Sequence, residues 1–556
     1  MKKINRETIL LILIILLGTV LRFWRLGKVP LSPDWDEAAL GYNAYSILHT
    51  GRDEYGKLLP LILRSFDDYK PAIYAYLAIL PIKFFGLNVF AVRFPAALLG
   101  SFAIFVTYAL TRELVKVSSL GKKEFTYVPI IASFLLAISP WHLQFSRIAF
   151  ESNVAMLIDM LIALFFIKGL KRPSLLIISA FFAGLNLYTY QAEKVFTPLL
   201  VIGLLLIWRK DLFKKANRNS IIISGIVGLL LTLPFLYMAK TTPEIFLRAK
   251  GTSLAADQTN FLAHTVERLN RDIIKGDKLG LIFDNRRVTY LLAYIGNYFS
   301  HFDFNWLFLS GDEARHHAPG MGLLYLYELP FLLWGLYTLA ASNLDNKSKK
   351  LIFFWLLLAP FPASFSSGAP HAVRSLRMMP MIQVITAFGA VAFLQWLFLQ
   401  KKVVRLFFLL SVTLFALFNF GYYINQYFNQ QDYFYADSWQ YGYQQAVGEV
   451  KQVESRYDKI IVSNQPYLDQ SYMFFLFYLK YDPALYLEHG GTVSGGFNEN
   501  HMDFGKYIFR PIDWKAEERN NKVLFVGRPQ DFPDGVKVIK TIFYPNGKEA
   551  IKIVEG

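Results

Sequence analysis

Apolar stretches close to 20 residues long recur along most of the chain, with short polar segments between them. Because roughly 20 helical residues cross the hydrocarbon core of a bilayer, this pattern predicts membrane-spanning helices. About eleven spans are expected, with starts near residues 8, 92, 127, 155, 174, 195, 220, 322, 351, 378 and 406. We therefore predict an all-α polytopic membrane protein whose transmembrane domain covers residues 1–428.

Basic segments between the apolar stretches predict the orientation. Lys and Arg gather in residues 2–6, 112–123, 168–172, 209–218, 347–350 and 401–405. All of these fall on one side if the N-terminus is cytoplasmic, as the excess of Lys and Arg in cytoplasmic loops requires. The first apolar stretch is long and no small-residue cleavage site follows it, so we expect an uncleaved first span. The protein is expected in the cell membrane.

Four longer segments then fall outside the cytoplasm, at residues 25–91, 139–153, 239–321 and 364–375. The first of them contains "KPAIYAYLAILPIKFFG", which is short for a span and is interrupted by Pro81. This stretch predicts an interfacial or re-entrant helix. An odd number of spans also leaves the C-terminal tail outside.

The tail changes in composition from about Gln431. Helical periodicity is present in "YQQAVGEVKQVESRY", and a second helix is expected in "YLDQSYMFFLFYLKY". Strands are expected in "KIIVSN", "KYIFRP", "KVLFVG", "VIKTIFY" and "EAIKIVEG". The tail therefore predicts a small extracytoplasmic α/β domain over residues 429–556, and it has no P-loop or glycine-rich phosphate turn.

Composition and charge fit this class. The chain is 54% hydrophobic and 18% charged, and its net charge is +16. Such a charge on a soluble protein would suggest nucleic acid as a partner. Here the basic residues lie in short loops, and no basic stripe with stacking aromatics is present, so we expect no nucleic-acid binding. The absence of cysteine excludes disulfides, thiolate metal sites and cysteine nucleophiles.

Three carboxylates follow the first span in "LSPDWDEAALGY", namely Asp34, Asp36 and Glu37. Outside the cytoplasm no nucleotide sugar is available, so chemistry there needs a substrate energised elsewhere, such as a lipid carrier. Sugar transfer from a lipid phosphate needs one base for the acceptor proton, whereas glycoside hydrolysis uses two carboxyl groups. Asp36 or Glu37 can supply that base. The acids could instead only solvate the end of a span.

The "DWD" sequence also matches the D-x-D pattern of nucleotide-sugar transferases, in which acids hold a divalent metal under a diphosphate. That pattern belongs after a strand in a cytoplasmic domain, whereas here it follows a membrane helix on the opposite side. A metal at the acids remains open without a nucleotide.

Arg147 and Glu151 are four residues apart in "FSRIAFESN". On one helix they would share a face and pair. Alternatively, Glu151 points inward and orients the acceptor or a metal. Asp159 lies further along, inside a predicted span, where an acid suggests function or a hydrogen bond between helices.

Cations near the outer face are candidates to bind a lipid phosphate, because arginine donates two parallel hydrogen bonds to it. The alternative is that their side chains reach toward lipid headgroups. The candidate residues are Lys70, Arg93, Arg147, His371, Arg374 and Arg377.

A divalent metal is an open alternative, and no cofactor is certain. His316 and His317, in "GDEARHHAPGMG", could bind it together with Asp312 or Glu313, or could pack the loop. Asp36 and Glu151 are further candidate ligands.

Several of these stretches resemble one family. "DEAALGYNAYSILHTGRDEYGKLLP", "DDYKPAIYAYL", "LNVFAVRFPAALLG" and "SPWHLQFSRIAFESN" are similar to the N-terminal half of polyprenol-phosphate-dependent glycosyltransferases of the GT-C fold, which include protein O-mannosyltransferases and aminoarabinose transferases. The resemblance implies an inverting transferase with its site in the first outer loop. It implies that Asp36 is the base, that Lys70 lies near the donor phosphate, and that Glu151 is the acid of the second outer loop, where many members have aspartate.

The sequence thus predicts transfer of a sugar from undecaprenyl or dolichyl phosphate to a protein, lipid or glycan acceptor at the outer membrane face. Two alternatives remain. One is a transporter or flippase of lipid-linked sugars, although paired halves with broken helices are absent from the pattern. The other is a ligase that uses a lipid-diphosphate oligosaccharide.

Overall fold

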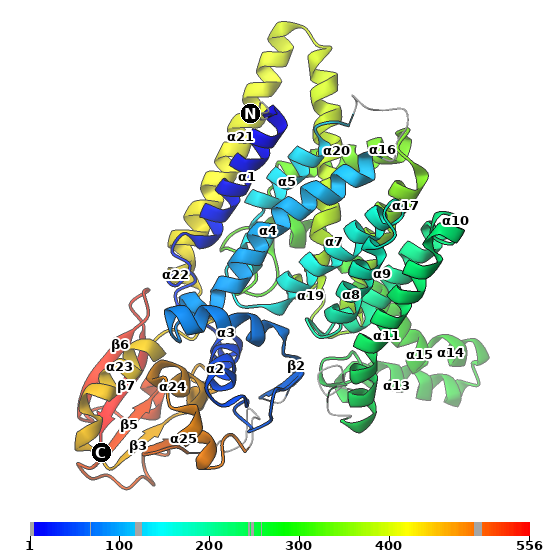
Figure 1. The fold of residues 1–556 in the computed structure, drawn as a ribbon. Coiled ribbons are helices and arrows are strands. Elements are labelled where there is room, and N and C mark those ends of the chain that lie inside the picture. Colours follow the sequence, from blue (N-terminus) through cyan, green and yellow to red (C-terminus); the bar gives the residue numbers. More distant parts are fainter. Residues whose placement is uncertain are drawn as a thin grey trace.

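The computed structural model describes residues 5–66, 68–116, 125–242, 245, 250–256, 258–493 and 503–556, with the backbone alone at 258–260. Figure 1 shows a long bundle of helices and, at its lower end, a small unit of strands and helices. Part of the predicted basic segment at residues 112–123 lies outside the described residues.

Every predicted span coincides with a helix. Five stretches are long and apolar enough to cross a membrane, namely Val89–Lys116, Glu151–Gly169, Lys215–Thr241, Ala372–Phe398 and Lys402–Phe434. Other helices of the bundle are shorter, so the number of eleven spans stays a prediction. The helices at the predicted positions are α1 (Arg6–Phe23), α4 (Val89–Lys116), α5 (Val128–Ile138), α7 (Glu151–Gly169), α8 (Leu175–Asn186), α9 (Glu193–Ile207), α11 (Arg218–Thr241), α16 (Glu328–Ala341), α17 (Asn346–Leu358), α20 (Met379–Phe398) and α21 (Lys402–Asn425).

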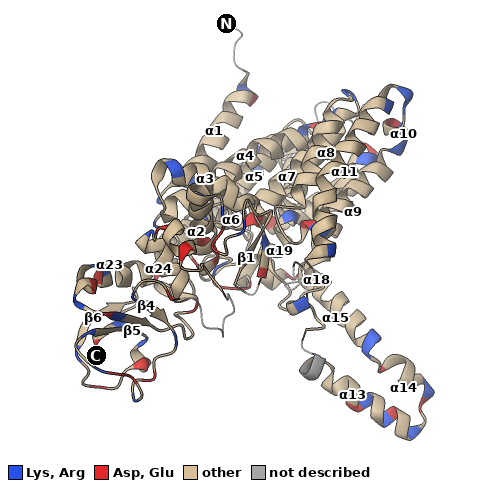
Figure 2. Cartoon of the chain, turned by 60° about the horizontal axis from the view of Figure 1, so that its bottom comes forward, with Lys and Arg blue, Asp and Glu red and all other residues tan. Residues whose placement is uncertain are grey.

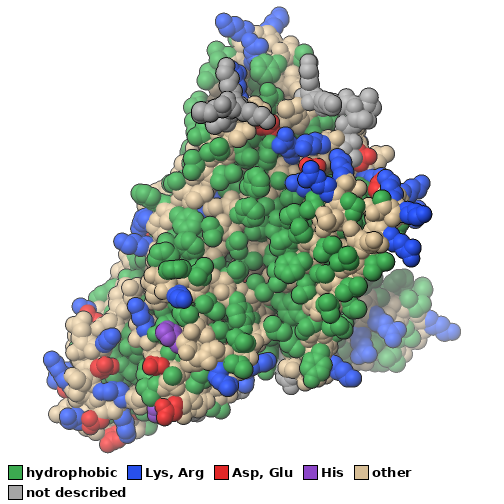
Figure 3. Space-filling view, in the orientation of Figure 1, with side chains coloured by type: hydrophobic (Ala, Val, Ile, Leu, Met, Phe, Trp, Pro, Cys, Tyr) green, Lys and Arg blue, Asp and Glu red, His purple; other side chains and the backbone are tan. Residues whose placement is uncertain are grey.

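Helices at the centre of the bundle are buried, and helices at its periphery expose apolar side chains. In the most apolar window of α7, 89% of the residues are buried, whereas none is buried in the corresponding windows that contain α11 and α21. Figure 3 shows apolar side chains over the middle of the molecule, with Lys and Arg gathered at its upper end. A multi-pass membrane protein accounts for such an apolar belt, because soluble proteins rarely expose large apolar patches.

The segment between α1 and α4, which was predicted as the first outer loop, contains α2 (Trp35–Thr50), the hairpin of β1 (Ile62–Ser65) and β2 (Asp68–Pro71), and α3 (Ile73–Phe85). Strands β1 and β2 are antiparallel, with Leu63 opposite Lys70. Helix α3 has 13 residues, including Pro81, and is only about 20 Å long. This length is too short to cross a bilayer core and agrees with the prediction of an interfacial or re-entrant helix.

The C-terminal unit confirms the predicted strands. Its five-stranded sheet has the order β4-β3-β5-β7-β6, with β3 parallel to β4 and β5, and with β7 antiparallel to β5 and β6. Both predicted helices are present, and α25 was not predicted. The elements are α23 (Tyr443–Val453), β3 (Lys459–Val462), α24 (Ser471–Leu479), α25 (Pro483–Glu488), β4 (Tyr507–Phe509), β5 (Val523–Gly527), β6 (Val538–Phe543) and β7 (Glu549–Glu555).

The C-terminal unit packs against the first outer loop through α2 and α24. At Gly41, an added Cβ would lie 2.6 Å from Val92 and 2.8 Å from the ring of Phe477, so glycine permits this close approach. Buried Glu54 lies at the same interface and accepts hydrogen bonds from Thr492 (2.7 Å) and Tyr472 (3.3 Å).

Shorter helices connect these parts. A helical hairpin also projects sideways from the bundle and is formed by α13 (Gln258–Lys275), α14 (Lys278–Phe283) and α15 (Arg286–Ser300) (Figure 2). The short connecting helices include α6 (Pro140–Phe145), α10 (Arg209–Leu212), α18 (Phe361–Ser364), α19 (Ala372–Ser375) and α22 (Gln431–Phe434).

Candidate active site

The acids of the first outer loop begin α2. Asp34 is the N-cap, and its side chain accepts a hydrogen bond of 2.9 Å from the N–H of Glu37. Glu37 reaches back to the N–H of Asp34, which completes a capping box. The helix therefore starts at Trp35, and each acid leaves it in a different direction.

Glu37 pairs with Arg93 of α4, and both side chains are fully buried. Arg93 donates two hydrogen bonds to the carboxylate, at 2.9 and 2.8 Å, and others to the carbonyls of Leu26, Pro30 and Ser32. The N–H of Ala149 also donates to Glu37, at 2.8 Å. These two predicted site residues hold the loops together, and they do not line the cavity described below.

Asp34 is buried and pairs with Arg315, whose Nη1 lies 2.8 Å from Oδ2 of Asp34. Burial raises the pKa of Asp34 to about 6, although Arg315 acts in the opposite direction. The guanidinium of Arg315 lies 5.1 Å from the ring centre of Trp35. Sequence reasoning did not single out Arg315, and its place between acids and histidines in "GDEARHH" was the available signal.

Asp36 is the acid of this group that faces the cavity. Its carboxylate accepts a hydrogen bond from Nζ of Lys70, and the side chains are 21% and 8% exposed, respectively. The β1–β2 hairpin brings Lys70 to this position, where its ammonium also lies 5.6 Å from the ring centre of Phe66.

A cavity of about 170 Å³ brings together many of the predicted site residues. Figure 2 shows charged residues gathered around α2, β1 and α19. Seven of the candidates from the sequence line the cavity, namely Asp36, Lys70, Glu151, Glu313, His316, His371 and Arg374. Its other lining residues are Pro71, Phe150, Tyr190, Gln191, Arg315 and Val373.

Arg147 takes a different place from Glu151. Helix α7 begins at Glu151, and Arg147 precedes it, so the shared helical face that would have paired the two residues does not form. Arg147 is buried and donates to the carbonyls of Leu21, Arg22, Trp24 and Val29 at 2.6 to 3.1 Å. It therefore supports the end of α1.

Arg374 and Arg377 also diverge. Arg374 lines the cavity and donates to Oγ of Ser366 (2.5 Å) and to the carbonyl of Ser367 (3.1 Å). Arg377 turns into the bundle, where its Nη2 lies 2.9 Å from Glu193 and its guanidinium packs on the rings of Tyr190 and Phe196.

Three side chains at the cavity could hold a divalent metal. Potential ligand atoms of Asp312, His316 and His371 all lie within 4.8 Å of one another. Oδ2 of Asp312 is 3.0 Å from Nδ1 of His316, and its other oxygen is buried with no hydrogen-bond partner among the described residues. Two imidazoles and one carboxylate are a ligand set that fits zinc or a similar ion. Asp312 and His316 were both predicted as possible metal ligands from the sequence, whereas His371 was predicted as a phosphate-binding residue.

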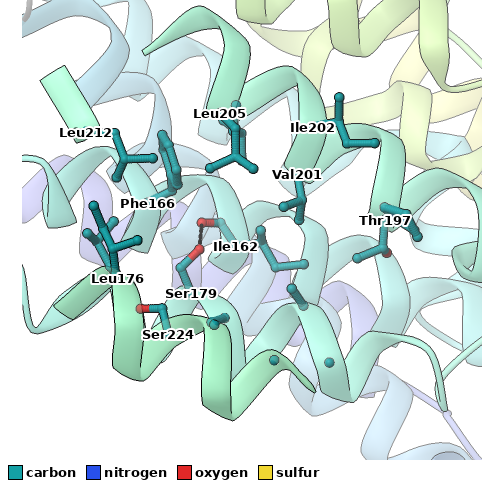
Figure 4. Close-up of a pocket in the computed structure, with 18 of the residues that line it drawn as sticks. Ile162, Phe166, Leu176, Ser179, Thr197, Val201, Ile202, Leu205, Leu212 and Ser224 are labelled. Carbon is teal, nitrogen blue, oxygen red and sulfur yellow. Dashed lines mark hydrogen bonds between the residues drawn. The ribbon is translucent and has the colours of Figure 1, made fainter. Parts of the chain in front are cut away.

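An apolar groove of about 580 Å³ opens between α7, α8, α9 and α11 (Figure 4). Thr197 of α9 lines the groove and donates a hydrogen bond of 3.0 Å to Glu193, which pairs with Arg377. Arg377 in turn packs on Tyr190, which lines the charged cavity. A chain of contacts therefore connects the apolar groove to the charged cavity.

A third cavity, of about 460 Å³, lies between the bundle and the C-terminal unit. It shares Glu313 and Arg315 with the charged cavity. Its other lining residues include Trp35, Asp437, Gln440, Tyr467 and Asp469.

Comparison with solved structures shows that the chain has the GT-C fold. It is similar to ArnT from Cupriavidus metallidurans, solved with undecaprenyl phosphate, at 12% identity and a TM-score of 0.55, over 98% of this chain and 97% of that one. It is also similar to the oligosaccharyltransferase AglB from Archaeoglobus fulgidus, solved with an inhibitory peptide and a dolichol-phosphate, at 13% identity and a TM-score of 0.51, over 94% of this chain and 69% of that one.

Part of the sequence also matches a family model. Residues 69–238 match the family model of the dolichyl-phosphate-mannose-protein mannosyltransferases. No curated protein sequence matches the chain. Together, the family match and the shared fold confirm the resemblance to GT-C glycosyltransferases that use polyprenyl-phosphate donors.

Proposed function

We propose that this protein transfers a sugar from a polyprenyl phosphate to a hydroxyl-bearing acceptor at the extracytoplasmic face of the membrane. One observation carries the proposal: Asp36, Lys70 and Arg374 line a single cavity that contacts connect to an apolar groove. A carboxylate, two cations and an apolar groove are the groups that a lipid-phosphate sugar donor and a sugar acceptor require.

In the proposed reaction, Asp36 takes the proton of the acceptor hydroxyl. The hydroxyl oxygen then forms a bond to the anomeric carbon, and the bond from that carbon to the phosphate oxygen breaks with inversion. The bond electrons leave with the phosphate, so that a phosphodiester with one negative charge becomes a monoester with nearly two. Lys70 and Arg374 stabilise the added charge, and Arg315 lies close enough to contribute.

The apolar groove between α7, α8, α9 and α11 is the proposed place of the polyprenyl chain. Its lining is apolar apart from Ser179, Thr197, Ser224 and Thr232 (Figure 4). Burying an isoprenoid chain there is favourable by the hydrophobic effect. The solved relative with undecaprenyl phosphate supports a donor of this kind.

The third cavity is the proposed entry for the acceptor. It lies beside the charged cavity and carries the aromatic rings of Trp35 and Tyr467 together with the carboxylates of Asp437 and Asp469. Such a lining suits a hydroxylated group that stacks on one face and donates hydrogen bonds at its edge. A protein, lipid or glycan acceptor can present that group.

A divalent metal bound by Asp312, His316 and His371 is part of the proposal. When bound, it would supply positive charge beside the donor phosphate. His316 and His371 line the charged cavity, so these side chains would orient that charge toward the phosphate.

The proposed orientation places the N-terminus in the cytoplasm and the C-terminal unit outside it. Lys and Arg at the upper end in Figure 3 support this orientation, because cytoplasmic loops carry the excess of basic residues. The charged cavity then lies at the opposite, outer end of the bundle.

Turnover of a lipid-linked donor tests the proposal. Purified protein in nanodiscs is incubated with a panel of undecaprenyl and dolichyl phosphates that carry radiolabelled mannose, glucose or arabinose, together with membrane extract as acceptor. Release of free polyprenyl phosphate with transfer of label to the extract supports the proposal. Unchanged donor across the panel contradicts it, and release only from lipid-diphosphate oligosaccharides would favour the ligase alternative.

A further inference from the structure

The hairpin of α13, α14 and α15 leaves large apolar side chains exposed. In α13, Val266, Ile273 and Ile274 are 53%, 59% and 85% exposed. Their spacings of seven and eight residues put them on one helical face. A second such stripe occurs in α15, where the exposed apolar side chains are Leu291, Leu292, Ile295 and Phe299.

Basic side chains cluster where the hairpin turns. Residues 258–300 contain six basic and four acidic residues. Lys275, Lys278, Arg286 and Arg287 are all exposed and lie around α14. Exposed apolar stripes with Lys and Arg beside them are typical of helices that lie in a membrane interface, where the cations meet anionic headgroups.

The position of the hairpin fits this environment. Helix α11, whose apolar window has no buried residue, precedes the hairpin in the chain. In Figure 1 the hairpin and α3, the predicted interfacial or re-entrant helix, both lie toward the lower end of the spans. A pocket of about 370 Å³ between α15 and the helices α17 and α18 is lined by Ile295, Phe299, Leu357 and other apolar or aromatic residues, so the exposed stripe of α15 continues into the bundle surface.

We propose that the hairpin lies flat on the membrane at the outer end of the bundle, with its apolar stripes in the acyl boundary and its basic residues among anionic lipid headgroups. The occupant of this surface is therefore lipid. Its charge complements the basic turn, and no residue in the apolar window of the preceding span α11 is buried.

Hydrogen bonds connect the hairpin to the charged cavity. Nδ2 of Asn297 in α15 donates to the carbonyls of Ser364 and Ser366, both at 3.2 Å, and the N–H of His371 donates to Nε2 of His301 at 3.3 Å. Ser366 in turn accepts a hydrogen bond from Arg374. A hairpin bound to lipid would thus fix the depth of Arg374 in the membrane. The relevance of this depth to catalysis rests on the proposed function, whereas the binding of the hairpin to lipid does not.

Site-specific fluorescence tests the proposal, because the chain contains no cysteine and one introduced thiol takes a unique label. Bimane is attached to Ile274→Cys and Leu292→Cys, on two different helices. The matched control is His264→Cys, on the polar face of α13 with a side chain that is 86% exposed. Each full-length variant is placed in nanodiscs of phosphatidylcholine and phosphatidylglycerol, and quenching by nitroxide-labelled lipid is compared with quenching by iodide.

At positions 274 and 292 we expect lipid quenching several-fold above that of the control, with iodide quenching several-fold below it. Removing phosphatidylglycerol should lower the lipid quenching at least about twofold. Iodide quenching as strong as at position 264 would put the hairpin in water and overturn the proposal. Shielding from both quenchers would mean that protein covers the stripes, and would also overturn it. Lipid quenching that does not depend on phosphatidylglycerol would contradict the proposed contact between the basic residues and anionic headgroups.

Discussion

At the scale of single residues, three acids within four positions have three different environments. Asp34 caps α2 and pairs with Arg315, and Glu37 is buried against Arg93. Asp36 lies between them in sequence, yet it alone of the three lines the charged cavity. The direction of each side chain therefore decides its role: Asp34 and Glu37 stabilise the structure, and Asp36 is available for the proposed catalysis.

The buried pair predicts a stability effect that is separate from activity. Glu37→Gln removes the charge that compensates Arg93, and breaking such a buried pair costs about 3–5 kcal/mol. We expect a clearly lower midpoint of thermal unfolding in detergent, measured by circular dichroism. Asp36→Asn is the matched control, since Asp36 is partly exposed, and its midpoint should stay close to that of the wild type. Equal losses in both variants would contradict the division of roles.

The cations predict a kinetic effect. The phosphate gains charge as the donor bond breaks, so Lys70 and Arg374 should stabilise the transition state more than the bound donor. In Arg374→Gln we expect kcat to fall by about 10- to 100-fold, with a smaller rise in KM for the donor. Lys548→Gln, at an exposed position of the C-terminal unit, serves as the control. A change in KM alone would show that Arg374 only binds the donor.

At the scale of elements, periodicity and apolar length predicted most of the structure. Each predicted span coincides with a helix, and each predicted strand coincides with a strand. The reason is that the local pattern of apolar and polar residues largely determines where helices and strands form. The α13–α15 hairpin was predicted only as part of a long outer segment. Its apolar stripes are interrupted by Gly276 and by loops, so no single stretch of sequence showed the periodicity of an amphipathic helix.

The candidate site was predictable only where residue type and position coincide. Asp36 and Glu151 follow from their place next to predicted spans, and Lys70 follows from its place in the long segment after the first span. Arg93 and Glu37 look equivalent to them in sequence, and only the tertiary structure shows that they pair with each other. Asp312 joins His316 and His371 across about 60 residues of chain, a contact that no local pattern encodes.

The contact between α2 and the C-terminal unit predicts a pH dependence. Burial raises the pKa of Glu54 from its ordinary value of 4.5 to about 7, although hydrogen bonds from Asn43, Thr492 and Tyr472 oppose the shift. The folded protein therefore holds this proton more tightly than the unfolded chain. The resulting stability is present below about pH 4.5 and is lost as pH rises to about 7, by about 3 kcal/mol in all.

Thermal unfolding at pH 5 and pH 8 measures this effect. The wild type should lose more stability over that range than Glu54→Gln, whose amide carries no titrating proton. Identical pH profiles for the two proteins would show that Glu54 is not the group responsible.

At the scale of the whole molecule, the proposed reaction requires the charged cavity to lie on the extracytoplasmic side of the membrane. Tyr467 is 59% exposed on the C-terminal unit, and the side chain of Lys214, near α10, is 63% exposed at the other end of the bundle. In intact cells, a membrane-impermeant maleimide should label Tyr467→Cys and should label Lys214→Cys only after lysis. The reverse pattern would place the cavity in the cytoplasm.

The central claim is that Asp36 is the base for transfer from a polyprenyl phosphate. Its most direct test is single-turnover transfer by Asp36→Asn, with Asp68→Asn of the same loop as control, since Asp68 does not line the charged cavity. Both variants are checked for wild-type unfolding midpoints. We predict that Asp36→Asn loses about 10²- to 10⁴-fold of the transfer rate while Asp68→Asn keeps it. Transfer by a folded Asp36→Asn at the wild-type rate would contradict the account.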